Sequence, residues 1–396
     1  MFHYKNKEIV VYSQDMEKEQ ATLYDGKQYS TMEISKIIDI RKRPFNHPFI
    51  LVKTDDENLE EFYQSYTKDA KDLYDSTDGY INLYRCNSVV QEGLRIFKSL
   101  QDIEVDPIQD FEVPYISSCG GGIRIGEKYE GSGWKYDKRS FYPFIMSTKL
   151  GFPIKEGIFK EITKKHFNTN ANVGAGIYHC KIDVTNPKLF TELQSNMYTH
   201  HEVNWAKKLK LKMELLDERY LSYEGKLSTS GGKLFGKYTH MLYPFKIKGN
   251  KLAKLMLNSL WGNLVSKNYY KYYRNLDEME LRDTDEIIDM VPQPNGKYMF
   301  KICNKNDKNP FKYDYARIKP FLLGYGRVYM HRQVQYHGSD NIVFSHTDSI
   351  ISKVKLNATN KRLENEKKIG SWHFEGYSNN CKIYNKNKYD FNYLKK

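Results

Sequence analysis

The sequence has few cysteines, and none of them stands in a paired motif. Its five cysteines include no C-x-x-C pair, which argues against a zinc site and against a disulfide framework. A run of about 18 apolar residues, the length of a membrane-spanning helix, is also absent. The N-terminus lacks the basic-then-apolar layout of a secretory signal. We therefore expect an intracellular protein with no membrane among its partners.

Positive charge and tyrosine are both in excess. The 396 residues hold 62 Lys and Arg against 49 Asp and Glu, a formal net charge of +13, together with 33 Tyr. This composition suits a nucleic-acid partner, because amines meet phosphates and rings stack on bases. It also suits ordinary solubility and the codon bias of an AT-rich genome, such as that of a virus, a linear plasmid or an organelle.

The chain is long enough for two or three domains, and its local patterns give a coarse division. Two short apolar runs, Ile9–Tyr12 and Phe49–Val52, precede a predicted helix over Ser88–Leu100 with apolar residues at helical spacing. The acidic stretch Asp102–Pro114 contains two prolines and is predicted to be a linker. The basic stretch Lys361–Lys396 has few large aliphatic residues and is predicted to be exposed.

Two segments each place one aspartate at a turn. The segment Trp134–Asp137 is predicted to be a strand that ends at Asp137, before a turn and a helix that tolerates Pro143 in its first turn. The segment Asn341–Lys353 is predicted to be a β-hairpin with Asp348 at its tip. A carboxylate beside backbone carbonyls suits a hard cation such as Mg²⁺. Taken alone, however, either aspartate is more commonly a cap or a turn residue.

The segment Lys251–Gly262 is predicted to be a helix with two distinct faces. Lys254, Asn258 and Trp261, spaced by four and three residues, share one face. A cation, an amide and a flat ring there suit a triphosphate and a base, although such a face on a surface helix is ordinary. The other face carries an apolar stripe made of Ala253, Met256, Leu257, Leu260 and Leu264.

In this order, the three segments resemble the motifs of family B DNA polymerases. They read Asp-x-x-Ser-Phe-Tyr-Pro, Lys-x-x-x-Asn-Ser-x-Trp-Gly and Thr-Asp-Ser, and Ala253–Leu260 is the most specific part. The resemblance is strongest to the protein-primed branch of small bacteriophages and linear plasmids, and it covers roughly residues 80 to 390. It implies an α+β fold: a right-hand polymerase palm, built of an antiparallel sheet with helices, plus helical fingers.

The same resemblance implies a domain order for a chain that is short at both ends. Residues 1–113 would be a degenerate exonuclease-like remnant without catalytic acids. Residues 114–360 would be the palm and fingers, with insertions at about 151–200 and 265–312. Residues 361–396 would be a basic C-terminal segment that starts a truncated thumb.

The resemblance also implies roles for single residues in nucleotide addition. Asp137 and Asp348 would be the catalytic, metal-binding aspartates, and the backbone carbonyl of Lys138 would reach the second metal and the nucleotide. Tyr142 would be the steric gate that packs under the deoxyribose and rejects a 2′-hydroxyl. Nucleotide binding would fall to the polar face of the predicted helix: Lys254, Asn258 and Trp261, with Trp261 standing where the family has Tyr.

Further residues would contact DNA. Gly120 and Gly121 stand where the family has a Tyr-x-Gly-Gly template contact, and Ser349 follows the second aspartate. A late Lys-x-Tyr motif that grips the primer strand is matched by Lys386, Lys388 and Tyr389.

Several positions depart from the family pattern. His346 replaces the first aspartate of Asp-Thr-Asp-Ser, which predicts weakened rather than absent activity. Cys86 stands where the third exonuclease motif has an aspartate, and the Tyr-x-Gly-Gly motif has lost its tyrosine. Only seven residues follow Tyr389, where the family continues into a thumb.

The function that follows from the resemblance is template-directed addition of deoxynucleotides to a primer 3′-hydroxyl, without proofreading. Two Mg²⁺ ions, or Mn²⁺, would be the cofactors, and template-primer DNA and dNTP the partners. Priming by a terminal protein, and a separate chain that supplies thumb or processivity function, stay open. The alternatives are a catalytically impaired module that binds DNA or a replication protein, and another kind of nucleotidyltransferase.

Overall fold

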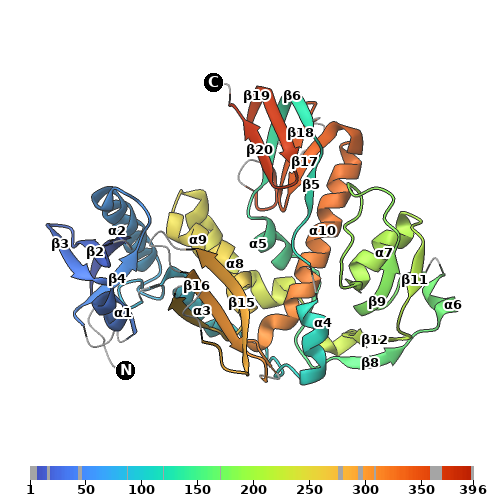
Figure 1. The fold of residues 1–396 in the computed structure, drawn as a ribbon, viewed down its shortest axis with the longest axis horizontal. Helices are drawn as coiled ribbons and strands as arrows, with labels where there is room; N and C mark the ends of the chain where they lie inside the picture. Colours follow the sequence, from blue (N-terminus) through green and yellow to red (C-terminus); the bar gives the residue numbers. More distant parts are fainter. Residues whose placement is uncertain are drawn as a thin grey trace. The chain divides into compact units, whose positions relative to one another are not determined.

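The computed structural model describes most of the chain, as two compact units (Figure 1). The first unit comprises Met1–Gln101 and Tyr238–Lys312, and the second comprises Asp102–Lys237 and Tyr313–Lys396. Helix α8 (Gly231–Ile247) runs across the boundary at residue 237. The described residues are 7–15, 18–42, 47–86, 88–118, 120–169, 171–274, 280–292, 298–306, 309–356 and 368–393.

The first unit contains a four-stranded sheet in the order β3-β2-β1-β4. The two apolar runs near the N-terminus become the parallel neighbours β1 and β4, and the other pairs are antiparallel. A small core of buried side chains, including Val10, Tyr12 and Leu51, lies on this sheet. The bounds are β1 (Glu8–Asp15), β2 (Gln20–Tyr24), β3 (Tyr29–Glu33), β4 (Phe49–Lys53), α1 (Ile34–Lys42) and α2 (Leu59–Ser76).

Two predicted helices of this unit are confirmed. Helix α3 (Val89–Ser99) begins at Ser88, whose hydroxyl accepts the amide of Gln91, and it ends at the cap residue Leu100. Helix α9 (Lys251–Leu264) buries the whole predicted apolar stripe and packs against α3 and α2. A separate antiparallel sheet has the order β14-β16-β15, with bounds β14 (Tyr270–Arg274), β15 (Asp285–Pro292) and β16 (Tyr298–Asn304).

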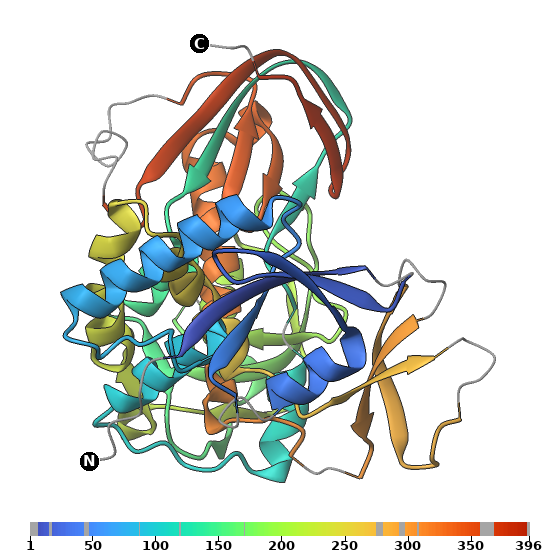
Figure 2. The same ribbon diagram turned by 90° about the vertical axis from the view of Figure 1, so that its left-hand side faces the viewer.

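The second unit is built on a six-stranded antiparallel sheet in the order β20-β19-β6-β18-β17-β5. Figure 2 shows the long strands of this sheet curling strongly. The curl brings β5 close to the end of β19. The backbones there are so near that a Cβ added to Gly126 would lie 2.4 Å from the backbone nitrogen of Lys386. The bounds are β5 (Arg124–Gly126), β6 (Tyr129–Lys138), β17 (Ile342–His346), β18 (Ser349–Ser352), β19 (Trp372–Asn385) and β20 (Lys388–Phe391).

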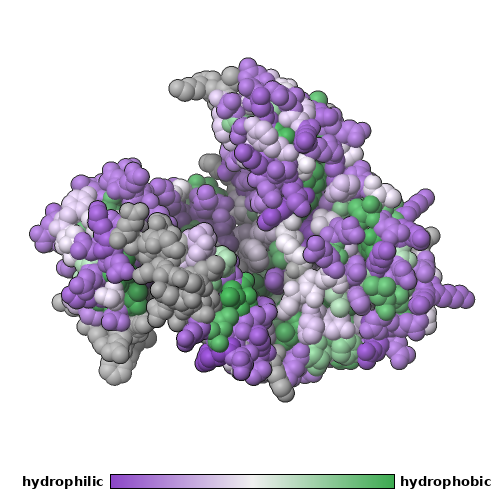
Figure 3. All heavy atoms as spheres, viewed as in Figure 1, coloured by the Kyte–Doolittle hydropathy of each residue, from purple (hydrophilic) through white to green (hydrophobic). Residues whose placement is uncertain are grey.

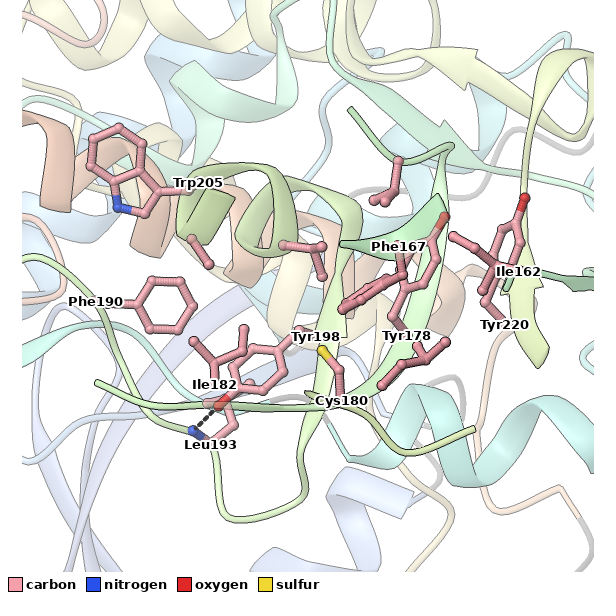
Figure 4. Close-up of a cluster of buried hydrophobic side chains, with 14 of the residues drawn as sticks. Ile162, Phe167, Tyr178, Cys180, Ile182, Phe190, Leu193, Tyr198, Trp205 and Tyr220 are labelled. Carbon is pink, nitrogen blue, oxygen red and sulfur yellow. Dashed lines mark hydrogen bonds between the residues drawn. The ribbon is translucent and has the colours of Figure 1, made fainter. Parts of the chain in front are cut away.

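A second sheet of this unit has the order β10-β9-β12-β8, with β11 paired to β9. Its aromatic core is shown in Figure 4, where the Tyr198 hydroxyl accepts a hydrogen bond from the Leu193 amide at 2.8 Å. The long helix α10 (Ile318–Tyr336) packs against α7 and α5. The bounds are α5 (Phe141–Met146), α7 (His200–Lys208), β8 (Ile158–Glu161), β9 (Gly176–Ile182), β10 (Met197–Thr199), β11 (Met213–Leu215) and β12 (Arg219–Ser222).

The remaining short elements of this unit connect the two sheets and α8. Strand β7 pairs with β13 just before α8 begins. The linker predicted over Asp102–Pro114 has no regular structure until residue 110. The bounds are α4 (Val113–Ser117), β7 (Gly151–Pro153), α6 (Lys164–Phe167) and β13 (Ser228–Ser230).

The C-terminal segment differs from the prediction that it is exposed. Strand β19 pairs with β6 along most of its length, and Trp372, Cys381 and Ile383 are buried. The few apolar residues of this segment are enough because β19 is a paired strand in which only a few positions, interrupted by two register shifts, are covered. Residues 361–367 and 394–396 lie outside the described residues, as do parts of the predicted insertion at 265–312.

The surface in view is mostly hydrophilic, with scattered hydrophobic areas (Figure 3). This agrees with the mean hydropathy of −0.72. Within the described part of the chain, no helix combines the length and the apolar character needed to cross a membrane.

Candidate functional site

The predicted strand-turn-helix around Asp137 is confirmed. Strand β6 ends one residue after Asp137, and the chain turns at Ser140, which adopts a left-handed conformation with φ of 48°. The carbonyl of Ser140 then accepts the amide of Phe144 at 2.8 Å, so that α5 begins at once. Pro143 is accommodated in the first turn of α5, where its missing N–H is not needed. Asp137 therefore stands at a strand end, followed closely by Tyr142.

The predicted hairpin is also confirmed, and it brings Asp348 beside Asp137. Strands β17 and β18 turn at Thr347, which has φ of 56°, and Asp348 follows at the tip. Ser349 is the register partner of Asp137, and the Lys138 amide donates to the Asp348 carbonyl at 2.9 Å. Two carboxylates thus stand on adjacent antiparallel strands at the same end of the sheet.

Tyr142 lies close to Asp348. Burial of the phenol raises its pKa to about 12, the nearby Arg327 opposes this rise, and Asp348 adds to it. The ring of Tyr142 lies near Gly326 of α10, where a Cβ would be 3.6 Å from a ring carbon. A larger side chain at position 326 would compete for the space of the ring. The Tyr142 ring therefore lies near both α10 and Asp348.

The side chain of Lys138 points to the face of β6 opposite Asp137. Neighbouring residues of a strand lie on opposite faces, and the Lys138 side chain is buried. Its Nζ donates to the Tyr329 hydroxyl at 2.9 Å and to the Gly370 carbonyl at 2.8 Å. It also lies 4.6 Å from the centre of the Trp372 ring. A contact from Lys138 to metal or nucleotide would therefore come from its backbone, as the resemblance implies.

A buried arginine holds the glycine-rich segment, and the sequence reading did not find it. Arg327 donates to the carbonyls of Gly121 at 2.5 Å and Gly120 at 3.1 Å, and it pairs with buried Glu202 at 2.7 Å. The adjoining Ile123 carbonyl accepts the Thr347 amide at 2.9 Å. Gly120 and Gly121 are thereby held next to the hairpin of Asp348. A single charged residue within the otherwise uncharged stretch Phe321–Tyr329 is the sequence signal that indicates this buried arginine.

The late Lys-x-Tyr motif lies on the same curled sheet. Lys386 stands in the turn between β19 and β20, and Lys388 begins β20. The Tyr389 ring lies 4.7 Å from the Phe344 ring, and the Lys135 ammonium lies 5.5 Å from the centre of the Tyr389 ring. Lys135 was not singled out from the sequence, although it stands two residues before Asp137 on the same face of β6.

His346 stacks under the neighbouring aromatic residue. Its ring is nearly parallel to that of Phe344, at 6.5 Å and 9°. The Ser349 hydroxyl donates to the His346 carbonyl at 3.2 Å. The imidazole therefore stands on the hairpin of Asp348, in the strand that leads to the turn.

Lys254, Asn258 and Trp261 form a second group, on α9 of the first unit. Lys254 and Asn258 are exposed and Trp261 is half-buried, and all three lie on one face of the helix, as predicted. The opposite face is fixed to α3 and α8, where the Tyr238 hydroxyl donates to the Met256 carbonyl at 2.9 Å. The predicted site residues thus fall into two groups, one in each compact unit.

The fold has known counterparts among solved structures. The chain has a fold like that of phi29 DNA polymerase. The complex of that enzyme with primer-template DNA matches with a TM-score of 0.58 and 13% identity, over 97% of this chain and 86% of that chain. The ternary complex with primer-template DNA and incoming nucleotide matches with a TM-score of 0.56 and 18% identity, over 93% and 70%. The complex with single-stranded DNA gives 0.53 and 18%, over 92% and 68%.

Comparison of the amino-acid sequence with known families and proteins finds no match. No family model matches the chain, and no curated protein sequence matches it. At 13% to 18% identity the structural likeness establishes the fold: a mixed α+β architecture with a curled antiparallel sheet.

The two carboxylates at the hairpin fit a hard divalent cation that takes most of its ligands from water and substrate. Asp137 and Asp348 supply two carboxylates, and the described residues contain no group of three or more His, Cys, Asp or Glu arranged to hold a metal. Mg²⁺ commonly uses one or two carboxylates and takes its other ligands from water and substrate phosphates. The site fits that pattern, and it does not resemble the four-ligand cage of a structural zinc.

Proposed function

We propose that this protein is a template-directed DNA polymerase that adds deoxynucleotides to a primer 3′-hydroxyl, in the replication of a virus, a linear plasmid or a similar element. The observation that carries the proposal is that Asp137 and Asp348 lie beside each other at the end of two paired strands. Their setting, a fold like that of phi29 DNA polymerase in complex with primer-template DNA, supports the same conclusion.

The two carboxylates and the Lys138 carbonyl would hold two Mg²⁺ ions, with Mn²⁺ as a substitute. Bound there, the ions would assist deprotonation of the primer hydroxyl and neutralise charge on the departing diphosphate. The protein's own part is to hold the carboxylates in place. The Lys138 side chain, fixed by Tyr329 and Gly370, ties the end of β6 to α10 and so limits movement of Asp137.

Selection and binding of the nucleotide would depend on Tyr142 and on the polar face of α9. Tyr142, fixed by its packing, would occupy the space that a 2′-hydroxyl needs and so exclude ribonucleotides. Lys254 and Asn258 would bind the triphosphate, and Trp261 would present its ring to the base or sugar. The exposure of Lys254 and Asn258 on one face of α9 supports this assignment.

DNA would be held by the glycine-rich segment and by the turn and strand that follow β19. The backbone of Gly120 and Gly121, positioned by Arg327, would approach the template strand closely because neither residue has a side chain. Ser349 would lie beside the primer terminus. The remaining primer contacts would come from Lys386, Lys388 and Tyr389.

We propose that the enzyme does not proofread. Cys86 stands where the resemblance calls for a metal-binding aspartate, and burial raises the pKa of its thiol. The thiol also donates to the Ser88 carbonyl at 3.2 Å, so it is neutral and engaged. A neutral thiol is a poor ligand for Mg²⁺.

A second candidate function is a catalytically impaired module that binds DNA or a replication protein. The observation that favours it is His346, an imidazole on the hairpin where the resemblance calls for a carboxylate. Priming by a terminal protein, and a thumb or processivity chain from elsewhere, are compatible with either candidate.

A primer-extension assay separates the two candidates. The full chain is incubated with a labelled primer-template, the four dNTPs and Mg²⁺ or Mn²⁺, and products are resolved by length. A polymerase extends the primer as the template dictates, and omission of the templated dNTP stops it at that position. Binding of the primer-template without extension in either metal would leave only the binding module.

A further inference from the structure

A basic cavity lies between α7 and α10 in the second unit. Its volume is about 590 Å³. Lys207, Lys208 and Lys210 line one side, at the end of α7. Tyr325 and Arg332 line the other side, and with Val328 they lie at positions i, i+3 and i+7 of α10, which places them on one helical face. Neither Asp137 nor Asp348 belongs to this cavity.

The four cations have no acidic partner within the described parts of the chain. No carboxylate there lies within 4.0 Å of the charged nitrogens of Lys207, Lys208, Lys210 or Arg332. Other lysines of this unit are paired: Lys160 with Glu224, and Lys212 with Asp183 at 3.9 Å. Four cations around one concavity, with no carboxylate near them among the described residues, produce a positive potential that attracts an anion.

Contacts with neighbouring groups hold three of these four cations in place. The Lys208 ammonium and the Arg332 guanidinium lie 5.9 Å and 5.1 Å from the centre of the same Trp205 ring. The Lys207 ammonium donates to the carbonyls of Thr169 at 3.0 Å and Ala171 at 2.8 Å. The charges of Lys207, Lys208 and Arg332 are therefore positioned at the cavity before any ligand enters, which lowers the ordering cost of binding.

His201 supplies an independent sign of a ligand. Its Nε2 is buried and has no hydrogen-bond partner among the residues that the structure describes, and the residue lines the cavity. Burial, the neighbouring His200 and Arg332 keep the pKa of the His201 imidazole well below its ordinary value, so the ring is neutral. A buried polar atom without a partner is unfavourable, and a ligand oxygen or its bound water would relieve it.

We propose that this cavity binds phosphate groups of a nucleic-acid strand at a place separate from the paired aspartates. The cations would neutralise the phosphates, Asn172 and Asn204 would add hydrogen bonds, and the Tyr325 ring would offer a face to a base. The volume is in the range of about 300–1,000 Å³ that small-molecule sites occupy, enough for a nucleotide unit of a strand. The contact does not require catalysis, so it is separable from the proposed polymerase activity.

The test is strand binding by the full chain without divalent cations. A fluorescein-labelled single-stranded oligonucleotide of about 20 nucleotides is titrated at several KCl concentrations, because each phosphate contact contributes about 0.7 to the log–log salt slope. The cavity variant combines Lys208→Ala, Lys210→Ala and Arg332→Ala, all at exposed positions. The matched control removes the same charge from exposed lysines of the same unit: Lys181→Ala, Lys226→Ala and Lys233→Ala.

The proposal predicts that the cavity variant loses about tenfold or more in affinity and that its salt slope falls by about 2, while the control stays within about twofold. Unchanged affinity in the cavity variant, or an equal loss in the control, would overturn it. Thermal unfolding of each variant verifies that the fold is retained.

A second readout identifies the source of the phosphate. Lysines of the parent protein are acetylated with an amine-reactive ester, alone, with the oligonucleotide, or with inorganic phosphate, and modification is mapped by mass spectrometry. Protection of Lys208 and Lys210 by the oligonucleotide supports the proposal, whether or not phosphate also protects. Protection of these lysines by inorganic phosphate but not by the oligonucleotide would indicate a site for a small free anion. Protection by neither ligand would indicate that the cavity binds a protein partner instead. Either result overturns the proposal.

Discussion

At the scale of single residues, the chemistry of the proposed reaction site depends on a few side chains whose neighbours fix them. Asp137 and Asp348 stand beside each other at the end of paired strands, Tyr142 is half-buried near Asp348, and the Lys138 side chain is buried on the face opposite Asp137. His346 is the residue that departs most from the resemblance. Substitution of Tyr142 should therefore change sugar selection, and substitution of His346 should change the affinity for Mg²⁺.

Tyr142→Ala is expected to let the enzyme incorporate ribonucleotides that the parent rejects, because the ring would occupy the space of a 2′-hydroxyl. The measurement is the ratio of kcat/KM for dNTP and rNTP, which should fall by at least about tenfold. Tyr142→Phe is the matched control and should keep the parent ratio, since the ring and not the hydroxyl does the excluding.

The pH dependence of that ratio is a further check on Tyr142. Burial raises the pKa of its phenol to about 12, so the group is protonated below that value and loses its proton only above it. The parent ratio should therefore be flat across the neutral and mildly alkaline range. A ratio that does not change in Tyr142→Ala would remove Tyr142 from the gate role.

His346→Asp is expected to raise the apparent affinity for Mg²⁺ in primer extension. A carboxylate adds a negative charge on the hairpin of Asp348, and nearby negative charge favours a bound cation. The measurement is the Mg²⁺ concentration that gives half-maximal rate, which should fall several-fold. His346→Asn keeps the position polar but uncharged and should leave the metal dependence near that of the parent; a shift equal to that of His346→Asp would mean that charge is not the cause.

At the scale of elements, the curled sheet joins segments that are far apart in sequence. Strand β5 pairs with β17 and also meets the end of β19, so Arg124–Gly126 lies beside Lys386. The curl holds the proposed primer contacts on the same sheet as the two aspartates. A glycine is needed at the meeting point because the backbones approach closely.

Gly126→Ala is expected to destabilise the second unit. Its Cβ would lie 2.4 Å from the backbone nitrogen of Lys386, which cannot move without shifting the end of β19. Overpacking of this kind costs about 1–3 kcal/mol in the free energy of unfolding, measured by chemical denaturation. Gly151→Ala is the control, because the nearest heavy atom to its Cβ would be 3.9 Å away. Equal stability of the two variants would show that β5 and β19 do not depend on this close approach.

The elements that sequence predicted best are those specified by nearby residues. Apolar residues at helical spacing predicted α3, an apolar stripe predicted α9, and polar tip residues predicted the β17–β18 hairpin. Contacts between distant segments were not predictable in this way. The pairing of Arg327 with Glu202 spans 125 residues, and the pairing of β19 with β6 depends on a sheet whose strands give no local sign of their partners.

At the scale of the whole molecule, the proposed site residues are divided between two compact units. Asp137, Tyr142 and Asp348 belong to the second unit, and Lys254 and Asn258 belong to the first. The proposed metal-binding group and the proposed triphosphate-binding group can therefore be tested separately, one unit at a time. Variants of the two residues in the first unit should change the KM for dNTP, and variants of the two aspartates in the second unit should change the rate of incorporation.

Lys254→Ala is expected to raise the KM for dNTP about tenfold or more with a smaller effect on the affinity for DNA, because an ammonium that meets a triphosphate contributes to substrate binding. Steady-state kinetics with varied dNTP measures this. Lys248→Ala removes an equally exposed lysine of the same unit and should leave KM unchanged. A KM for Lys254→Ala equal to that of the parent would exclude α9 from triphosphate binding.

The most direct test of two-metal catalysis is single-nucleotide incorporation by Asp137→Asn and Asp348→Asn, with Asp340→Asn as an exposed carboxylate control from the same unit. Substitution by Asn removes the charge that a cation needs and keeps the shape of the side chain. Each site variant should lose at least about a hundredfold in rate while its affinity for primer-template stays within a few-fold, and the control should match the parent. If either site variant keeps more than about a hundredth of the parent rate, the paired aspartates are not the catalytic metal ligands.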